Sequence, residues 1–99
     1  MTVEELIELF DEFANMPYDE TCFEKIENPM HCCPDVCAFL MLQAIAGGTD
    51  NMVSGAEHDE IYLSVDLDDV LDSCPTKEWL KDLYRCGVMV NYNGFSMYV

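Results

Sequence analysis

The side chains best suited to bind a metal ion gather in one short stretch, His31-Cys32-Cys33, which Cys37 follows. Cys33 and Cys37 lie four residues apart across the start of an expected helix. At that spacing both thiols would face one ion, with His31 or His58 nearby. Imidazole and thiolate are the usual ligands of structural zinc.

A complete zinc site is not predicted, because structural zinc typically uses two ligand pairs at characteristic spacings. No second pair of that kind occurs, and Cys74 and Cys86 do not form one. Reduced buried cysteine behaves as a small hydrophobic residue. We therefore expect buried structural cysteines, no cofactor, and His31, Cys33 and Cys37 as the metal-ligand candidates if an ion is bound.

The same stretch contains the residue types of a cysteine nucleophile, since Cys32 or Cys33 stands beside His31, with Asp35 close by. Catalysis would need a base within reach of the thiol and a third group to orient the base. Neighbouring residues on a turn rarely point toward one another, and nearby acids raise the pKa of a thiol rather than lower it. We expect no enzyme activity.

Carboxylates follow in two further groups that could attract a divalent cation. They are Glu57, His58, Asp59 and Glu60, and then Asp66, Asp68, Asp69 and Asp72. The EF-hand pattern, with its glycine and closing glutamate, is absent. This pattern predicts weak, diffuse cation binding rather than a dedicated site.

The charge balance is the most unusual property of the chain. Twenty Asp and Glu face four Lys and Arg, a formal net charge of -16. Such a field repels nucleic acids and anionic membranes and attracts cationic protein surfaces. Solubility is the ordinary explanation of an acidic composition, but this imbalance exceeds what solubility needs. With 51% hydrophobic residues the chain is no disordered tail, and we expect one folded domain over residues 1–99.

The first expected helix has charges of one sign only. Thr2 and Glu5 form a capping box, in which each side chain satisfies a free backbone N–H at the helix start. Apolar residues share one face: Val3, Leu6, Ile7, Phe10, Phe13 and Ala14. The acids share the opposite face: Glu4, Glu5, Glu8, Asp11 and Glu12. Solvated helices usually mix charge signs. This face and the aspartates Asp66, Asp68, Asp69 and Asp72 are therefore the predicted partner-binding residues.

The rest of the chain predicts an α+β fold. A short helix is expected over Thr21 to Glu27, and an apolar central core helix over Pro34 to Ala46, stopped by Gly47-Gly48. A loop is expected over Thr49 to Glu60, a strand over Ile61 to Val65, and helices over Asp66 to Leu71 and Lys77 to Cys86.

A hairpin closes the chain, because Asn93-Gly94 is the strongest two-residue turn signal. Pairing outward from this turn fixes the register. It sets Tyr92 opposite Phe95, Val90 opposite Met97 and Val88 opposite Val99 on one face, with Asn91 and Ser96, and Met89 and Tyr98, on the other.

From Pro34 onward, the order helix, strand, helix, helix, hairpin resembles a winged helix-turn-helix. This resemblance places Lys77 to Cys86 at the position of the recognition helix, where Lys77, Lys81 and Arg85 form one stripe. Three interpretations stay open: a solvated face balanced by Glu78 and Asp82, a contact in a homodimer, or a phosphate contact. Nucleic-acid binding needs a net basic footprint, and the charge of the whole chain opposes it.

In its size, its charge and the one-signed helix of Glu4, Glu5, Glu8, Asp11 and Glu12, the chain resembles the small acidic inhibitors that phages encode. These are the anti-CRISPR proteins and the DNA mimics that block restriction enzymes or DNA glycosylases. The resemblance implies a protein of the host cytoplasm that occupies the nucleic-acid channel of a basic partner and binds no nucleic acid itself.

Two other function classes remain open, an adaptor built on a degenerate winged helix and a Cys/His metal protein. An apolar patch of Met16, Tyr18, Phe23 and Met30 would favour an interface that is not purely electrostatic. The acidic N-terminus predicts no signal peptide, and no apolar run reaches the roughly 18 residues of a membrane span. We therefore expect a cytoplasmic protein with reduced thiols.

Overall fold

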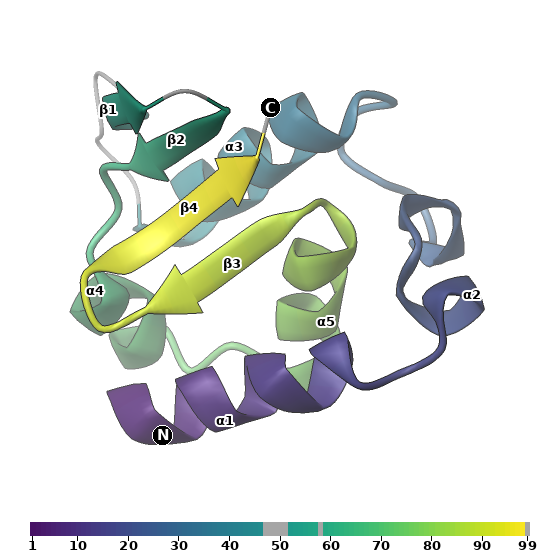
Figure 1. The fold of residues 1–99 in the computed structure, drawn as a ribbon, viewed down its shortest axis with the longest axis horizontal. Coiled ribbons are helices and arrows are strands. Elements are labelled where there is room, and N and C mark those ends of the chain that lie inside the picture. Colours follow the sequence, from purple (N-terminus) through teal and green to yellow (C-terminus); the bar gives the residue numbers. More distant parts are fainter. Residues whose placement is uncertain (47–51, 58, 99) are drawn as a thin grey trace.

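The computed structural model describes residues 1–46, 52–57 and 59–98. Its helices are α1 (Val3–Ala14), α2 (Tyr18–Thr21), the 3-10 turn η1 (Phe23–Lys25), α3 (Pro34–Ala46), α4 (Leu67–Asp72) and α5 (Lys77–Arg85). Its strands are β1 (Val53–Glu57), β2 (Glu60–Leu63), β3 (Val88–Asn91) and β4 (Gly94–Tyr98). The four strands form one antiparallel sheet in the order β1-β2-β4-β3. Figure 1 shows α3 and α5 behind the sheet and α1 below β3. The mixed α+β prediction is confirmed.

The capping box at the start of α1 is confirmed. The Thr2 amide donates to Glu5 Oε1 and the Glu5 amide donates to Thr2 Oγ1, both at 3.2 Å. Leu6, Phe10 and Phe13 are buried on the side of α1 that faces the core. Exposed Ala14 lies outside this apolar face, contrary to its predicted place there.

Helix α3 has the predicted bounds, but the prediction that it is buried all round is wrong. Cys37, Ala38, Met41 and Leu42 are buried, whereas Gln43 and Ala44 are exposed and Phe39 is half-buried. A chain of 99 residues has too few elements to surround a helix, so only one face of α3 enters the core.

Strand β1 lies within the stretch expected to be a loop, so that part of the prediction is wrong. It pairs with β2 through Ala56 opposite Ile61 and Glu57 opposite Glu60, with a bulge between Val53 and Gly55. Gly55, Ala56 and Glu57 of β1 are weak strand formers, and pairing with β2 overrides that preference. Of the strand predicted over Ile61 to Val65, the part up to Leu63 is confirmed; positions 49–51 and 58 lie outside the described residues.

The C-terminal hairpin is confirmed, but its predicted register is wrong. Asn91 pairs with Gly94, Val90 with Phe95, Met89 with Ser96 and Val88 with Met97, so Tyr92 and Asn93 form the turn. Asn91 Oδ1 accepts a hydrogen bond from the Asn93 amide at 2.8 Å, and this Asx turn sets the reversal one residue earlier. Each residue of β3 pairs with a residue of β4 two positions earlier than predicted. Because side chains alternate along a strand, this shift keeps the apolar residues of both strands on the core face.

The predicted helix over Thr21 to Glu27 is replaced by α2 and η1, because Cys22 between them is extended, with φ -77° and ψ 154°. The Arg85 Nε donates to the Glu20 carbonyl at 3.1 Å, and this bond satisfies a carbonyl in the last turn of α2. The helices expected over Asp66 to Leu71 and Lys77 to Cys86 are confirmed within one residue at each end.

The core joins α1 and α5 through an aromatic group. The Phe10 ring lies 5.6 Å from Phe13 and 5.9 Å from Tyr84, the latter edge to face. Buried Leu80 and Leu83 of α5, with Val88 and Phe95 of the hairpin, complete this part of the core. No helix within residues 1–46, 52–57 and 59–98 is long and apolar enough to cross a membrane.

Candidate partner-binding surface

All nine predicted partner-binding acids lie on the molecular surface. We call them together the acidic surface: Glu4, Glu5, Glu8, Asp11 and Glu12 of α1, and Asp66, Asp68, Asp69 and Asp72 at α4, each of them exposed. The apolar side of α1 fixes the orientation of these acids, because burial of Leu6, Phe10 and Phe13 turns the opposite side of the helix toward solvent.

The aspartates are held by α4, a short helix anchored by the fully buried Val70. Asp66 is the N-cap residue, and Asp68 and Asp69 lie in the first turn. The partial positive charge at a helix start favours carboxylates there. The same holds for Glu4 and Glu5 in the first turn of α1. The two helices thus accommodate a high density of negative charge at their starts.

The structure brings the two groups of acids together. Helices α1 and α4 are in contact, and Figure 1 shows α4 above the first turn of α1. A hollow of about 570 Å³ lies between them, lined by Val3 of α1, Asp66 and Asp68 of α4, and Tyr92 and Asn93 of the hairpin turn. This adjacency is absent from the sequence analysis, because a tertiary contact between residues so distant in the chain leaves no local signal.

Few cations neutralise this surface. Among the described residues, only Glu12 of the nine acids has an ion-pair partner, Lys77, at 3.9 Å. Both side chains are more than 60% exposed, so the pair adds little stability. It lies at the C-terminal end of the acidic face of α1, beside the start of α5.

Of the predicted basic stripe, Arg85 is already engaged within the chain. Its guanidinium contacts Asp82 at 2.7 Å and Glu78 at 3.8 Å, its Nε bonds the Glu20 carbonyl, and only 11% of the side chain is exposed. With Lys77 paired to Glu12, only Lys81 of the stripe has no charged partner in the described part of the chain. Local balance by Glu78 and Asp82 accounts for Arg85, and the dimer contact stays a prediction.

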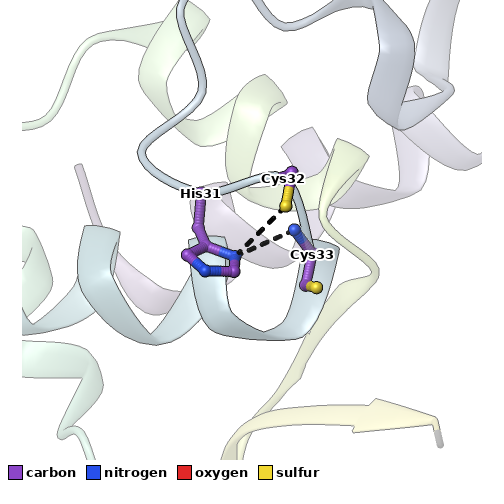
Figure 2. Close-up of side chains that lie close together, drawn as sticks. All are labelled: His31, Cys32 and Cys33. Atoms are coloured by element: carbon purple, nitrogen blue, oxygen red, sulfur yellow. Dashed lines mark hydrogen bonds between the residues drawn. The ribbon is translucent and has the colours of Figure 1, made fainter.

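The expectation of buried cysteines holds for only two of the six: Cys37 and Cys86 are buried, Cys22 is half-buried, and Cys32, Cys33 and Cys74 are exposed. His31, Cys32 and Cys33 are exposed, and their ligand atoms lie within 4.8 Å of one another (Figure 2). Cys37 is fully buried, so a shared site of Cys33 and Cys37 is contradicted. Cys33 precedes α3 and faces solvent, while Cys37, in the first turn of α3, faces the core. Cys32 was not among the predicted ligand candidates, but in the structure it takes the place of Cys37 in the cluster.

The ring of His31 is oriented by the turn before α3. The Cys33 amide donates to His31 Nδ1 at 3.0 Å, and Cys32 Sγ lies 3.9 Å from the same nitrogen. Neighbouring side chains do meet at this turn, contrary to the expectation from sequence. A hydrogen bond with the Cys32 thiol and its charge raise the pKa of Cys33, with smaller effects from burial and Asp35. The expected direction is therefore confirmed, although the neighbouring Cys32 thiol contributes more to it than the acid Asp35.

The carboxylates of the β1–β2 turn do not gather in the same way. Glu57 and Glu60 pair across the strands, and the Tyr62 hydroxyl donates to Glu57 Oε2 at 3.5 Å. Burial, with the charges of Glu57 and Glu60, raises the pKa of Tyr62. His58 lies outside the described residues. Within the described part of the chain, His31-Cys32-Cys33 is the only group with metal-ligand spacing.

Comparison of the chain with protein families, curated proteins and solved structures finds no match.

Proposed function

We propose that this protein binds a basic partner protein through the acidic surface and occupies the partner's nucleic-acid-binding site. One observation carries the proposal. Nine exposed carboxylates lie on the neighbouring helices α1 and α4, and among the described residues only one of them pairs with a lysine. It acts by binding, as an inhibitor of the anti-CRISPR or DNA-mimic type, in the cytoplasm where the nucleic-acid enzymes of a host cell work.

The density of charge along α1 supports mimicry. Five acids occur in 12 residues. At a rise of 1.5 Å per residue this is one negative charge per about 3.6 Å of helix. One strand of duplex DNA carries one charge per about 3.4 Å. A rigid helix therefore presents charge to a basic channel at a density close to that of a single DNA strand, and α4 widens the charged area.

The first experiment compares charge reversals at two places. The variant Glu4→Lys, Glu8→Lys, Asp11→Lys reverses the acidic face of α1 at exposed positions that pack against nothing in the core. The matched control, Asp19→Lys, Glu24→Lys, Asp59→Lys, changes the net charge equally at exposed positions outside the acidic surface. Both variants should fold, which circular dichroism checks.

Each protein is immobilised and exposed to cell extract at low salt. We expect the wild type and the control to retain the same nucleic-acid-binding proteins, which elute as salt rises because screening weakens charge pairing. The α1 variant should lose them. Equal loss of these proteins by both variants would show that net charge, not this surface, causes binding.

A second candidate function, an adaptor built on a degenerate winged helix, is supported by the order of the elements. Helices α4 and α5 lie between β2 and the β3–β4 hairpin, and β4 lies between β2 and β3 in the sheet. Such an adaptor would assemble through apolar contacts, for which Tyr18 and Met30 are exposed at 80% and 53%. Its binding would change little with salt, which separates it from the first proposal.

A further inference from the structure

A second group of functional side chains lies outside the acidic surface, at the turn that leads into α3. His31, Cys32 and Cys33 are consecutive, all three are exposed, and their ligand atoms lie within 4.8 Å of one another. Figure 2 shows the imidazole beside the two cysteines, with Nδ1 directed toward Cys32 Sγ and the Cys33 amide.

The ligand types and distances suit zinc. Zinc–sulfur bonds of about 2.3 Å and zinc–nitrogen bonds of about 2.0–2.1 Å place tetrahedral ligand atoms about 3.5–4 Å apart. The Cys32 Sγ to His31 Nδ1 distance is 3.9 Å, already in this range. The other distances between ligand atoms are at most 4.8 Å, and rotation of the exposed side chains can shorten them to this range. Two thiolates and an imidazole also exclude magnesium and calcium, which prefer oxygen.

The backbone holds the three residues in place. The Cys37 amide donates to the Cys33 carbonyl at 2.9 Å, which fixes Cys33 at the start of α3. The Cys33 amide donates to His31 Nδ1, so the proton is on Nε2, and the lone pair of Nδ1 is held by this amide in the absence of an ion. Asp35, the next acid along the chain, lies outside this group of ligand atoms, and its Oδ1 accepts from the Val36 amide at 2.9 Å.

We propose that His31, Cys32 and Cys33 bind one Zn²⁺ ion through the imidazole nitrogen and two thiolates, with the fourth position open to water. Both thiols lose their protons to solvent on binding, and the Cys33 amide exchanges its bond to His31 Nδ1 for one to water. This site is independent of the acidic surface and would give the protein a metal-dependent second function.

The test measures Zn²⁺ affinity of the reduced, full-length protein by competition with a chromophoric chelator. We expect one equivalent per chain in the wild type. Cys32→Ser and Cys33→Ser should each weaken binding at least about tenfold to 100-fold, the loss that outer-shell changes alone can cause. The matched control is Cys74→Ser, which removes an exposed thiol outside the cluster and should bind as the wild type does.

Cobalt reports the ligands directly. Co²⁺ in the same site should give a thiolate charge-transfer band that is halved in each single variant and lost in Cys32→Ser, Cys33→Ser. The proposal would be overturned if zinc binding survived the double variant but fell in Glu4→Lys, Glu8→Lys, Asp11→Lys. That result would assign the ion to the acidic surface. Absence of stoichiometric binding in the wild type would overturn it as well, and neither result bears on partner capture.

Discussion

Phe10 links α1 to α5 through its edge-to-face contact with Tyr84, and it is almost fully buried. The orientation of the acidic face depends on this packing, since α1 carries both Phe10 and the acidic residues. Phe10→Ala should lower the free energy of unfolding by about 3–5 kcal/mol, because it removes a ring and leaves a cavity. Denaturant unfolding measures the loss. Ile7→Ala, one turn before and half-exposed, should cost less, and equal costs would mean that α1 is oriented differently.

Cys86 is a buried thiol that contacts Met41 Sδ at 3.9 Å. Burial, with smaller effects from Cys37 and Asp82, raises the pKa of Cys86 above its ordinary value of 9.0. Above that pH the unfolded chain releases the proton while the folded chain keeps it. Stability is therefore complete below pH 9.0 and falls as the pH rises further.

The fall should be measured between pH 9.0 and 10.0, before the ordinary pKa of the Tyr62 phenol is reached. Cys86→Ala should be less stable than the wild type at neutral pH but should lose less stability over this range. Cys74→Ser, at an exposed position, serves as the control and should keep the wild-type slope. An unchanged slope in Cys86→Ala would mean that this thiol ionises in the folded state as it does in the unfolded chain.

At the scale of elements, local signals predicted α1, α3, α4 and α5 but not the division of the segment before α3 into α2 and η1. Thr2 and Thr76 cap α1 and α5 as N-cap residues, and Pro34 begins α3, so three helix starts were correct. Strand β1 could not be predicted, because its stability comes from pairing with β2. The same distinction applies to the cysteines: the sequence indicated the cluster before α3, but only the packing of α3 separates Cys33 from Cys37.

The hairpin turn is centred on Tyr92 and Asn93, and it depends on the Asn91 side chain and on Gly94, whose φ of 134° favours glycine. Because Asn91 Oδ1 accepts from the Asn93 amide, Asn91→Ala should lower the free energy of unfolding by about 1 kcal/mol. Asn93→Ala should cost less, since the hydrogen bond uses only its backbone amide. Denaturant unfolding of the two variants compares these costs. A greater loss for Asn93→Ala would favour the turn centred on Asn93 and Gly94.

At the scale of the whole molecule, the proposed function depends on the arrangement of charge rather than on its total. The sequence supplied the net charge of -16 and the one-signed face of α1. It did not supply the contact between α1 and α4, which joins two acidic groups separated by more than half the chain. It also did not indicate that Arg85 is enclosed by Asp82, Glu78 and the Glu20 carbonyl. The first feature brings the two acidic groups together, and the second pairs Arg85 with acids outside them.

The most direct test of the central claim is competition between this protein and nucleic acid for the captured partner. The partner is loaded with a labelled duplex or single strand that it binds, and the unlabelled protein is added at low salt. The wild type and the control Asp19→Lys, Glu24→Lys, Asp59→Lys should displace the nucleic acid, whereas Glu4→Lys, Glu8→Lys, Asp11→Lys should not. A complex that holds protein and nucleic acid at the same time would contradict the account, because the two would then occupy different surfaces.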